Sequence, residues 1–387
     1  MSRSNRILSE PENFRENIVN KLKMFTKDDK ISINLEKGIF NYTIQTANKR
    51  NLIKKSKKME KFKKVISQYP VLGFIIAYLV LLCVPSIFFT DLYQSHLSSL
   101  IFINIIVAAG LNIVKGYCGQ VTVGHVGLYA VGSYTAGCMF MYLGSDLWMT
   151  LPAAIIVTGL FGIAFGIPSF RLEGPYLALA TLGGGEAIRL FIENGEFFNS
   201  TYGISSISQP VIFGVPFDTP DKYYYISLPV MIIAVYFSYS ILKSSIGRAF
   251  MSVREDPISA AASGIDIKKY KILAFILSAM FAGAAGAVYA HLPPGYIHPN
   301  NYTVIEMVTF LAMVVFGGLG HIWGGIIGAI IITIVYDLTR PLYEYQLFIF
   351  GLTIVLTILF MPKGIGGFID KIFIDKRFKK KKVEEGK

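Results

Sequence analysis

Charged residues are scarce in this chain of 387 residues. Lys, Arg, Asp and Glu together make up 16% of it, whereas soluble domains carry about 25%. Hydrophobic residues reach 53%, and they are gathered into repeated runs close to the roughly 20 residues with which a helix crosses a bilayer. This pattern excludes a soluble enzyme with a large core. It predicts an all-α, polytopic transmembrane bundle that resides in the cell membrane.

Cysteine and catalytic motifs are also scarce. Cys83, Cys118 and Cys138 sit in or beside apolar runs without a CxxC pair or an adjacent histidine, so neither a disulfide framework nor a zinc site is expected. The sequence lacks a G-x-x-x-x-G-K-[ST] phosphate loop, an H-E-x-x-H pair and a nucleophile elbow. We therefore expect no catalytic residue, no bound cofactor or metal, and no nucleotide hydrolysis by this chain.

Positive charge is distributed unevenly. The formal net charge is +12, but residues 1–69 hold 17 of the 37 Lys and Arg residues, and nine more follow Met361. Basic flanks of this kind mark the cytosolic side of a membrane protein. The segment KKSKKMEKFKK either binds anionic lipid or forms a solvated tail that sets the topology. A nucleic-acid partner is not expected.

Ten apolar segments are candidate membrane spans. The fifth carries Glu186 and Arg189, and the eighth and ninth are joined only by GGLGHI, so these are candidates for broken or re-entrant helices. We therefore expect roughly eight to ten crossings. The ten segments run approximately from Leu72 to Phe89, Leu97 to Val114, Val121 to Leu143, Met149 to Ile167, Pro175 to Ile192, Ile226 to Leu242, Ile272 to Ala290, Thr303 to Phe316, Trp323 to Tyr336 and Tyr345 to Met361.

The positions of the basic residues test this count. With the amino end inside, 34 of the 37 Lys and Arg residues fall on inner segments, and only Arg189, Lys222 and Arg340 fall outside. This asymmetry obeys the positive-inside rule and predicts an even number of crossings with both termini in the cytosol. Four parts result: a basic tail over residues 1–69, a transmembrane domain over 70–361, a cytosolic loop over 243–271 within it, and a basic tail over 362–387.

Small residues recur at helical spacing in several segments. Pairs four positions apart occur in the third, seventh and ninth segments, and such pairs allow helix backbones to approach closely. The sequence therefore predicts close helix packing rather than substrate contact at these positions. They are Gly132, Ser133, Gly283, Gly286, Gly324 and Gly328.

Polar side chains interrupt the third and fifth segments. Unsatisfied polar groups are costly at membrane depth, so these side chains either form interhelical hydrogen bonds or line a transport pathway. Glu186, the only strong acid expected at mid-membrane depth, shares a helical face with Arg189. The two form a structural ion pair or a gate, and the glycines at 183–185 allow a break in the helix. The candidates for the pathway are Gln120, Thr122, His125, Tyr129, Glu186 and Arg189.

The longest polar interruption on the predicted inner side covers residues 243–271. Its sequence indicates short capped helices rather than a loose loop. Asp256 is expected to cap a helix that begins at Pro257, Gly264 to end that helix, and Asp266 to cap the next one. An ordered cytosolic loop of this kind either contacts a partner or only connects two spans.

Four blocks, in this order, resemble the permease subunits of ABC importers for branched-chain amino acids, and among these the longer of two paralogous branches. The blocks are GYCGQVTVGHVGLYAVGSYTAG, GPYLALATLGGGEAIRL, GRAFMSVREDPISAAASGIDIKKYKILAFILSAMFAGAAGAVYA and VFGGLGHIWGGIIGAIII. The closing FMPKGIGGFI is also similar to the ends of such chains. The resemblance runs from about Leu97 to Gly367.

This resemblance implies an importer in which two permease subunits form the pathway, two cytosolic ATPases drive transport and an extracytoplasmic binding protein delivers the substrate. The third block resembles the loop that such permeases present to their ATPases. Ile258 and Ser259 depart from the broader consensus, in which an acidic residue often precedes the two alanines. The positions that match this loop are Gly247, Arg248, Arg254, Glu255, Asp256, Ala260, Ala261 and Gly264.

Two other interpretations compete with an importer of branched-chain amino acids. An ion-coupled secondary transporter of small polar solutes would carry carboxylates for its coupling ion near the midplane, together with inverted internal repeats. A permease that resembles this one would instead serve urea, short amides or other amino acids. A membrane-embedded enzyme is a more distant third class.

Overall fold

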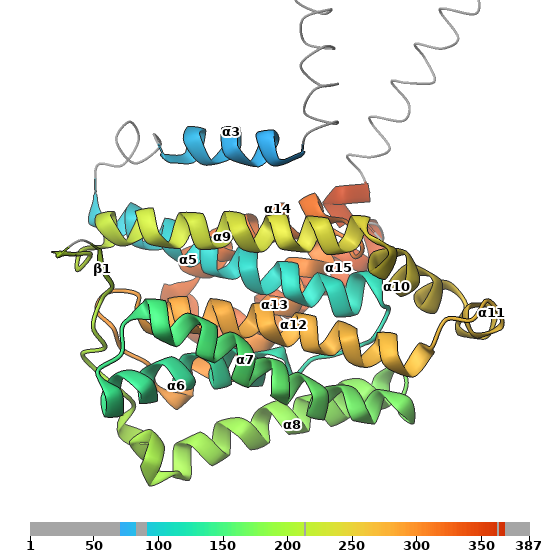
Figure 1. Ribbon diagram of the computed structural model, residues 1–387, viewed down its shortest axis with the longest axis horizontal. Helices are drawn as coiled ribbons and strands as arrows, with labels where there is room; N and C mark the ends of the chain where they lie inside the picture. The colour runs from blue at the N-terminus through green and yellow to red at the C-terminus, as the bar shows by residue number, and fades with distance from the viewer. Residues whose placement is uncertain (1–69, 83–90, 213, 362–363, 368–387) are drawn as a thin grey trace, which may run out of the picture. The chain divides into compact units, whose positions relative to one another are not determined.

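The structure, a computed structural model, describes residues 70–82, 91–212, 214–361 and 364–367. The chain divides into two units, residues 1–73 and 74–387, and the helical bundle belongs to the second (Figure 1). The predicted basic tails over residues 1–69 and 362–387 lie almost entirely outside the described residues. In chain order the elements are α3 (Pro70–Leu82), α5 (Leu92–Leu111), a π-helical turn (Asn112–Tyr117), α6 (His125–Leu143), α7 (Leu147–Gly166), a 3-10 turn (Ile167–Phe170), α8 (Pro175–Asn194), two 3-10 turns (Glu196–Phe198 and Ser200–Tyr202), β1 (Val211–Ile212), β2 (Val215–Pro216), α9 (Pro220–Lys243), α10 (Ser245–Glu255), α11 (Pro257–Ala262), α12 (Ile267–Ala290), a 3-10 turn (Pro299–Tyr302), α13 (Val304–Gly317), α14 (Ile322–Leu338), a 3-10 turn (Arg340–Tyr345) and α15 (Gln346–Phe360).

Each of the ten predicted spans contains a helix, which confirms the all-α polytopic bundle. The helix α8 is as long as its neighbours, but it carries Glu186, Arg189 and Glu193. Two shorter apolar helices cover Gly73–Leu82 and Ile322–Leu338. Seven helices of the described chain are long and apolar enough to cross a membrane: Leu92–Tyr117, His125–Leu143, Leu147–Phe170, Pro220–Lys243, Ile267–Ala290, Pro299–Gly317 and Gln346–Gly367.

The start of the third span differs from the prediction. The apolar run begins at Val121, but the helix begins only at His125, and residues 118–124 are not helical. Gly119 has a φ of +73°, a conformation that glycine adopts without steric cost and that interrupts a helix. A non-helical stretch in this position is acceptable only where protein or water satisfies its backbone groups.

The two candidates for broken helices differ from each other in structure. The helix α8 is continuous through the glycines at 183–185, so the predicted break is wrong. The eighth and ninth segments are two separate helices, α13 and α14, joined by the four residues 318–321. Gly318 and Gly320 in this turn have φ values of +109° and +82°.

The helix α12 packs against α5, α6 and α7, and Figure 1 shows it crossing the bundle among them. Its small residues let the neighbouring backbones approach. A methyl group placed on Gly283 would lie 2.6 Å from Thr158 Oγ1 and 2.7 Å from the Ala154 carbonyl oxygen, and one placed on Gly132 would lie 2.6 Å from the Gly283 Cα. No side chain fits at either glycine without displacing a neighbouring helix.

The other small residues predicted to pack also lie at helix crossings within this chain. A methyl group placed on Gly286 would lie 2.5 Å from the Tyr129 carbonyl oxygen. One placed on Gly324 would lie 2.2 Å from the Gly317 carbonyl oxygen, and one placed on Gly328 would lie 2.0 Å from the Met313 carbonyl oxygen. Ser133 is fully buried. These residues thus join α6 to α12 and α13 to α14.

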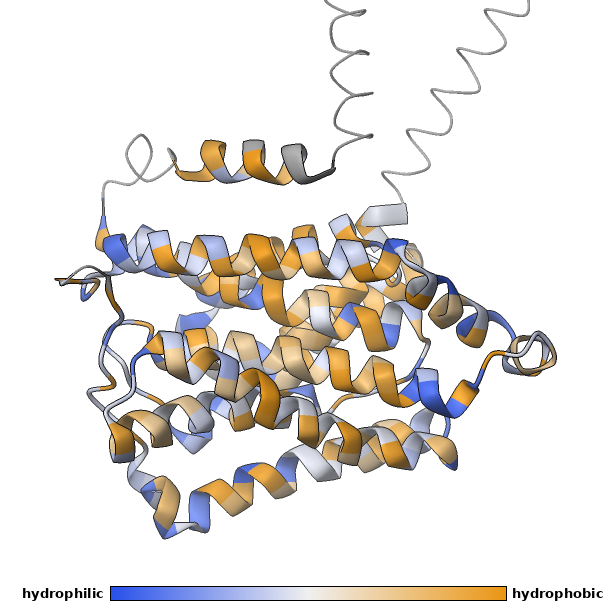
Figure 2. Cartoon of the chain, in the orientation of Figure 1, coloured by the Kyte–Doolittle hydropathy of each residue, from blue (hydrophilic) through white to orange (hydrophobic). Residues whose placement is uncertain are grey.

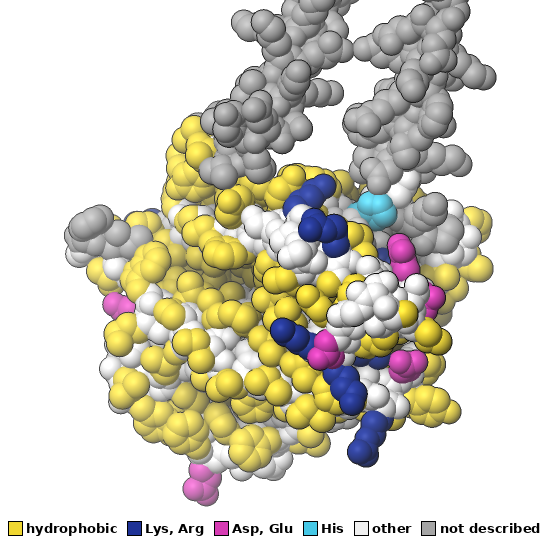
Figure 3. Space-filling model, turned by 45° about the vertical axis from the view of Figure 1, so that its right-hand side comes forward, with side chains coloured by type: hydrophobic (Ala, Val, Ile, Leu, Met, Phe, Trp, Pro, Cys, Tyr) yellow, Lys and Arg dark blue, Asp and Glu magenta, His cyan; other side chains and the backbone are white. Residues whose placement is uncertain are grey.

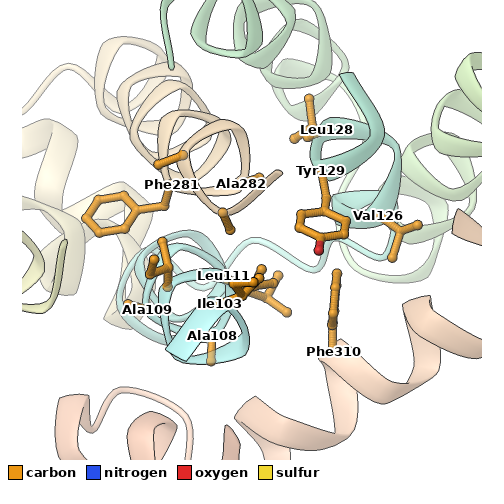
Figure 4. Close-up of a cluster of buried hydrophobic side chains, with 14 of the residues drawn as sticks. Ile103, Ala108, Ala109, Leu111, Val126, Leu128, Tyr129, Phe281, Ala282 and Phe310 are labelled. Atoms are coloured by element: carbon orange, nitrogen blue, oxygen red, sulfur yellow. The ribbon is translucent and has the colours of Figure 1, made fainter. Parts of the chain in front are cut away.

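Apolar side chains fill the space between the helices. Figure 4 shows Ile103 and Leu111 of α5, Phe281 of α12, and the Tyr129 ring directed toward Phe310 of α13. All five side chains are at least 92% buried. Dispersion contacts of this density hold helices together in a bilayer, where lipid removes most of the hydrophobic driving force between them.

The two ends of the bundle differ in construction. The short helices α10 and α11 lie at one end, here the α10–α11 end, and the connections over residues 195–219 and 291–303 lie at the opposite end (Figure 1). The latter two are joined by a bridge between Ile204 and Ile297. In Figure 2 hydrophobic residues dominate the long helices, and hydrophilic residues gather at α10 and the start of α12.

Candidate functional site

The helix α10 turns back tightly at the end of α9. The Ser244 hydroxyl oxygen accepts a hydrogen bond from the Ile246 backbone N–H at 3.2 Å, which caps the new helix. A methyl group placed on Gly247 would lie 2.2 Å from the Leu242 carbonyl oxygen, so only glycine fits this corner. Phe250 and Val253 are buried, and they anchor one face of α10 on the bundle.

The helix α11 is capped at both ends, as the sequence pattern predicted. The Asp256 carboxylate accepts hydrogen bonds from the backbone N–H groups of Ile258 at 3.0 Å and Ser259 at 3.2 Å. Gly264 ends the turn with a φ of +83°, and the Asp266 carboxylate caps α12 at 3.1 Å. Backbone groups are therefore satisfied throughout, and the segment is ordered by its own sequence.

The outward face of α10 and α11 combines charge with one large apolar side chain. Ile258 is 83% exposed. Arg248, Glu255 and Ala261 of the same two helices are also exposed, and Figure 3 shows Lys, Arg, Asp and Glu side chains gathered over this end. We call Ile258 and these three residues the α10–α11 surface. An exposed apolar residue on a surface that also carries charges is typical of a protein interface.

Arg254 differs from the other charged residues of α10. Its guanidinium Nη1 donates a hydrogen bond to the carbonyl oxygen of Gly116, in the π-helical turn. Sequence reasoning placed Arg254 on the partner-facing loop only and missed this contact within the chain. No local motif carries the signal, because the two residues lie 138 positions apart.

A second basic side chain near this end is also engaged within the chain. The Lys271 Nζ donates to the Ser169 carbonyl oxygen at 3.2 Å and lies 3.1 Å from a carboxylate oxygen of Glu173. Burial raises the pKa of the nearby Cys118 thiol to about 12, and the charge of Lys271 opposes this shift only in part. The thiol therefore stays protonated and is a poor nucleophile.

The non-helical residues 118–124 lie against α8. The Val123 N–H donates to Thr181 Oγ1 at 3.1 Å. A methyl group placed on Gly124 would overlap the Thr181 carbonyl oxygen, and one on Gly127 would lie 2.5 Å from the Gly185 Cα. Of the three α8 glycines that allow a break, only Gly185 faces this segment, whereas Gly184 faces Phe165 of α7 and a methyl group placed on Gly183 would meet no atom within 4 Å.

Three of the predicted pathway residues enter the bundle interior. Thr122, His125 and Tyr129 are all at least 95% buried. His125 Nδ1 lies 3.4 Å from Ser278 Oγ, and His125 Nε2 has no hydrogen-bond partner among the described residues. The Tyr129 ring packs on three aromatic rings, those of Tyr289, Tyr302 and Phe310, with centroid distances of 5.5 to 5.6 Å.

The other three predicted residues are engaged elsewhere. Gln120 Nε2 donates to the Cys118 carbonyl oxygen at 3.3 Å. Arg189 lies 2.6 Å from Glu186 and 2.7 Å from Glu193, so three charges form one network along α8. The structure therefore places Thr122, His125 and Tyr129 in the interior and Glu186 and Arg189 on α8, whereas Gln120 belongs to neither group.

Glu306 was missed by the sequence analysis, which took Glu186 as the only strong acid at membrane depth. It lies in the first turn of α13, inside the candidate span Pro299–Gly317. Its carboxylate accepts hydrogen bonds from the hydroxyls of Thr303 at 2.8 Å and Tyr336 at 2.9 Å. The signal was present, because a threonine three residues before a glutamate is the spacing of a capping box.

The opposite end is held together by His291. Its Nε2 lies 2.9 Å from Thr150 Oγ1 and its Nδ1 lies 2.6 Å from the Ser208 carbonyl oxygen. Burial lowers the pKa of this imidazole, against smaller opposing effects of the Ser208 carbonyl and the Asp146 charge. No cluster of three or more His, Cys, Asp or Glu side chains that would hold a metal occurs among the described residues.

Comparison with known proteins agrees with the architecture. The family model "Branched-chain amino acid transport system / permease component" matches residues 94–358. The high-affinity branched-chain amino acid transport system permease protein LivM of Escherichia coli (strain K12) is 33% identical over 316 residues, which are 76% of this chain and 74% of LivM. LivM of Salmonella typhimurium is 32% identical over 70% of this chain and 69% of LivM.

A paralogous permease protein is also similar. LivH of Escherichia coli (strain K12) is 25% identical over 286 residues, which are 68% of this chain and 90% of LivH. No solved structure matches the chain. The stronger similarity to LivM confirms the resemblance to the longer branch. This chain therefore belongs to the family of permease components of branched-chain amino acid transport systems.

Proposed function

We propose that this chain is the permease subunit of an ATP-driven importer and carries branched-chain amino acids inward. The observation that supports this most directly is the α10–α11 segment. It is capped at both ends and presents Ile258, Arg248 and Glu255 outward at one end of a membrane bundle. A chain without a phosphate loop has to receive the work of ATP hydrolysis through such a contact.

The proposed partners follow from the same reasoning. Two cytosolic ATPases dock on the α10–α11 surface, a second permease subunit completes the pathway, and an extracytoplasmic binding protein delivers leucine, isoleucine or valine to the opposite end. The relatives LivM and LivH are both named as permease proteins of one kind of transport system. This supports a complex of two paralogous permeases.

The pathway is proposed to pass the interior group Thr122, His125 and Tyr129. An imidazole nitrogen without a protein partner is costly in a buried site, and a substrate or water that reaches it relieves this cost. The network of Glu186, Arg189 and Glu193 is already neutralised in part within α8. We assign it a structural role.

The decisive experiment is reconstitution of the complex in proteoliposomes. Uptake of labelled leucine should require ATP, both permeases and a binding protein, and should be absent for this chain alone under a sodium or proton gradient. Uptake driven by a gradient alone would instead establish the secondary transporter. Competition by urea or short amides, without competition by valine, would overturn the substrate.

The orientation is tested separately. We propose that the α10–α11 end and both basic tails are cytosolic. Single cysteines at Lys58, Arg254 and Lys380 should then react with an impermeant maleimide only after permeabilisation, whereas cysteines at Asn199 and Asn300 should react in intact cells. Labelling of position 254 from outside would reverse the orientation.

A further inference from the structure

Arg254 lies against two separate parts of the chain through one side chain. Its guanidinium donates to the Gly116 carbonyl oxygen. A methyl group placed on Gly119 would lie 2.8 Å from the Arg254 Cγ, and one placed on Gly320 would lie 2.8 Å from the Arg254 Nη1. The stem and the guanidinium thus lie against glycines that leave room for them, one after the π-helical turn and one in the turn between α13 and α14.

Asn112 joins the same two turns from within the bundle. Its side-chain amide donates to the His321 carbonyl oxygen at 3.0 Å and its side-chain oxygen accepts from the Gly320 N–H at 3.0 Å. The residue is 98% buried. It also begins the π-helical turn Asn112–Tyr117, and such turns mark functional positions in helices frequently.

The turn between α13 and α14 is held by several parts of the chain. With 14 residues, α13 extends only about 21 Å at 1.5 Å per residue, which is less than the roughly 30 Å thickness of the hydrocarbon core. A methyl group placed on Gly364 would lie 2.4 Å from the Gly318 Cα, so Gly364 also packs against this turn. Three elements therefore hold its four residues.

We propose that Arg254 is a positioning residue that transmits the movement of α10 to the turn between α13 and α14. The inference rests on the proposed function, in which ATPases act on α10, and it adds the route inside the permease. A guanidinium suits this role because its fixed fork binds a carbonyl oxygen while its plane stays against the glycines. Movement of α10 pulls Gly116 and Gly320 together, and Asn112 keeps the two turns in register.

The test is the coupling ratio, leucine imported per ATP hydrolysed, in the reconstituted complex. Arg254→Gln should lower this ratio at least tenfold while the ATPases stay bound. Gly320→Ala should lower it at least threefold, because the new methyl group displaces the guanidinium without changing any charge. The double variant should be no worse than Arg254→Gln alone, since both changes break one contact.

The matched control is Arg171→Gln. Arg171 is an exposed arginine that follows the 3-10 turn Ile167–Phe170 at the same end of the bundle, and its substitution should leave the ratio unchanged. If Arg254→Gln prevents assembly, Arg254→Lys keeps the charge and most of the stem but loses the fork, and it should still lower the ratio at least threefold. A wild-type ratio in every assembled Arg254 variant would overturn the inference.

A distance measurement separates transmission from a merely structural role. Spin labels at Ile258→Cys and Trp323→Cys, in a background free of other cysteines, report α11 against α14. In the wild type, vanadate trapping should change this distance little, because the two parts move together. In Arg254→Gln, it should change the distance by several ångströms more. Equal changes in both proteins would overturn the inference. Absence of ATP-dependent uptake in the wild-type complex would instead overturn the proposed function.

Discussion

Gly283 in the helical bundle and Gly264 in the α10–α11 segment have opposite tasks. A methyl group placed on Gly283 in α12 would lie within 2.8 Å of both Thr158 and Ala154, whereas one placed on Gly264 would meet no atom within 4 Å. Gly264 has a φ of +83°, and Gly283 is an ordinary helical residue. Gly283 is needed because a side chain there has no space, and Gly264 is needed because the backbone there has a positive φ.

This difference shows how each region keeps its shape. The bundle is specified by contacts between distant residues, and a change of volume there disturbs several helices at once. The α10–α11 segment is specified by neighbours in sequence, through the caps at Ser244, Asp256 and Asp266. Variants in the bundle should therefore lower the stability of the folded subunit, whereas variants in the α10–α11 segment should change the coupling of transport to ATP hydrolysis.

The largest effect is expected from Gly283→Leu. A leucine side chain has no space between α6, α7 and α12, so overpacking should destabilise the folded subunit by about 3 kcal/mol or more. Thermal unfolding of the purified protein in detergent measures this. Gly351→Leu in α15 is the matched control, because a methyl group there meets no atom within 4 Å. An unchanged unfolding temperature for Gly283→Leu would mean that this crossing is not tight.

Gly264→Pro should abolish coupling while the bundle stays folded. Proline cannot adopt a positive φ, and it removes the hydrogen bond from the Gly264 N–H to the Ala261 carbonyl oxygen. We expect uptake per ATP to fall at least tenfold, with substrate delivery at the opposite end unchanged. Gly264→Asn should retain most activity, because asparagine tolerates this conformation. Wild-type uptake and ATP hydrolysis in Gly264→Pro would contradict the role of the segment.

Glu255→Lys should weaken docking of the ATPases moderately. Reversal of one exposed charge at an interface typically alters association by about 1 kcal/mol, or roughly fivefold in affinity, and the effect should shrink with added salt. Pull-down titration of the ATPases measures it. Glu196→Lys, an exposed charge reversal at the opposite end, should leave docking unchanged. If both variants bind alike, Glu255 lies outside the interface.

The smallest effect is a pH dependence centred on His291. Burial lowers the pKa of this imidazole below its ordinary 6.5, so the unfolded chain takes up the proton first as the pH falls. The contribution of the neutral His291 imidazole to the free energy of unfolding is therefore full above pH 6.5 and is lost progressively below it. Unfolding temperatures between pH 7.5 and 5 should decline less steeply for His291→Gln than for the wild type. Parallel profiles would mean that His291 does not contribute.

Local features could be predicted with good accuracy from sequence. The ten apolar runs each contain a helix, because helices in a membrane must satisfy every backbone group internally and therefore form wherever a run is long enough. The caps at Asp256 and Asp266 and the positive φ of Gly264 were also predictable. These features depend on residues that are near one another in the chain.

Other features depended on residues far apart in sequence. The helix α8 stays continuous through its three glycines, of which only Gly185 lies against residues 118–124. The sequence placed Arg254 only on the partner-facing loop, and the fold brings it to Gly116 as well. Glu306 had a readable capping pattern, but its contact with Tyr336 crosses from α13 to α14.

The sequence by itself determined a membrane bundle, its helices, the capped α10–α11 segment and the family. The bundle, its helices and the capped segment follow from hydrophobic run length and from hydrogen bonds between near neighbours, both of which are local. The family follows from the four sequence blocks that resemble it. The tertiary structure alone decided which glycines are needed for volume, which polar residues meet in the interior and which arginine binds a carbonyl oxygen of its own chain. Those outcomes depend on distances between backbones that only packing fixes, and helices in lipid pack by shape complementarity rather than by any pattern readable along one helix.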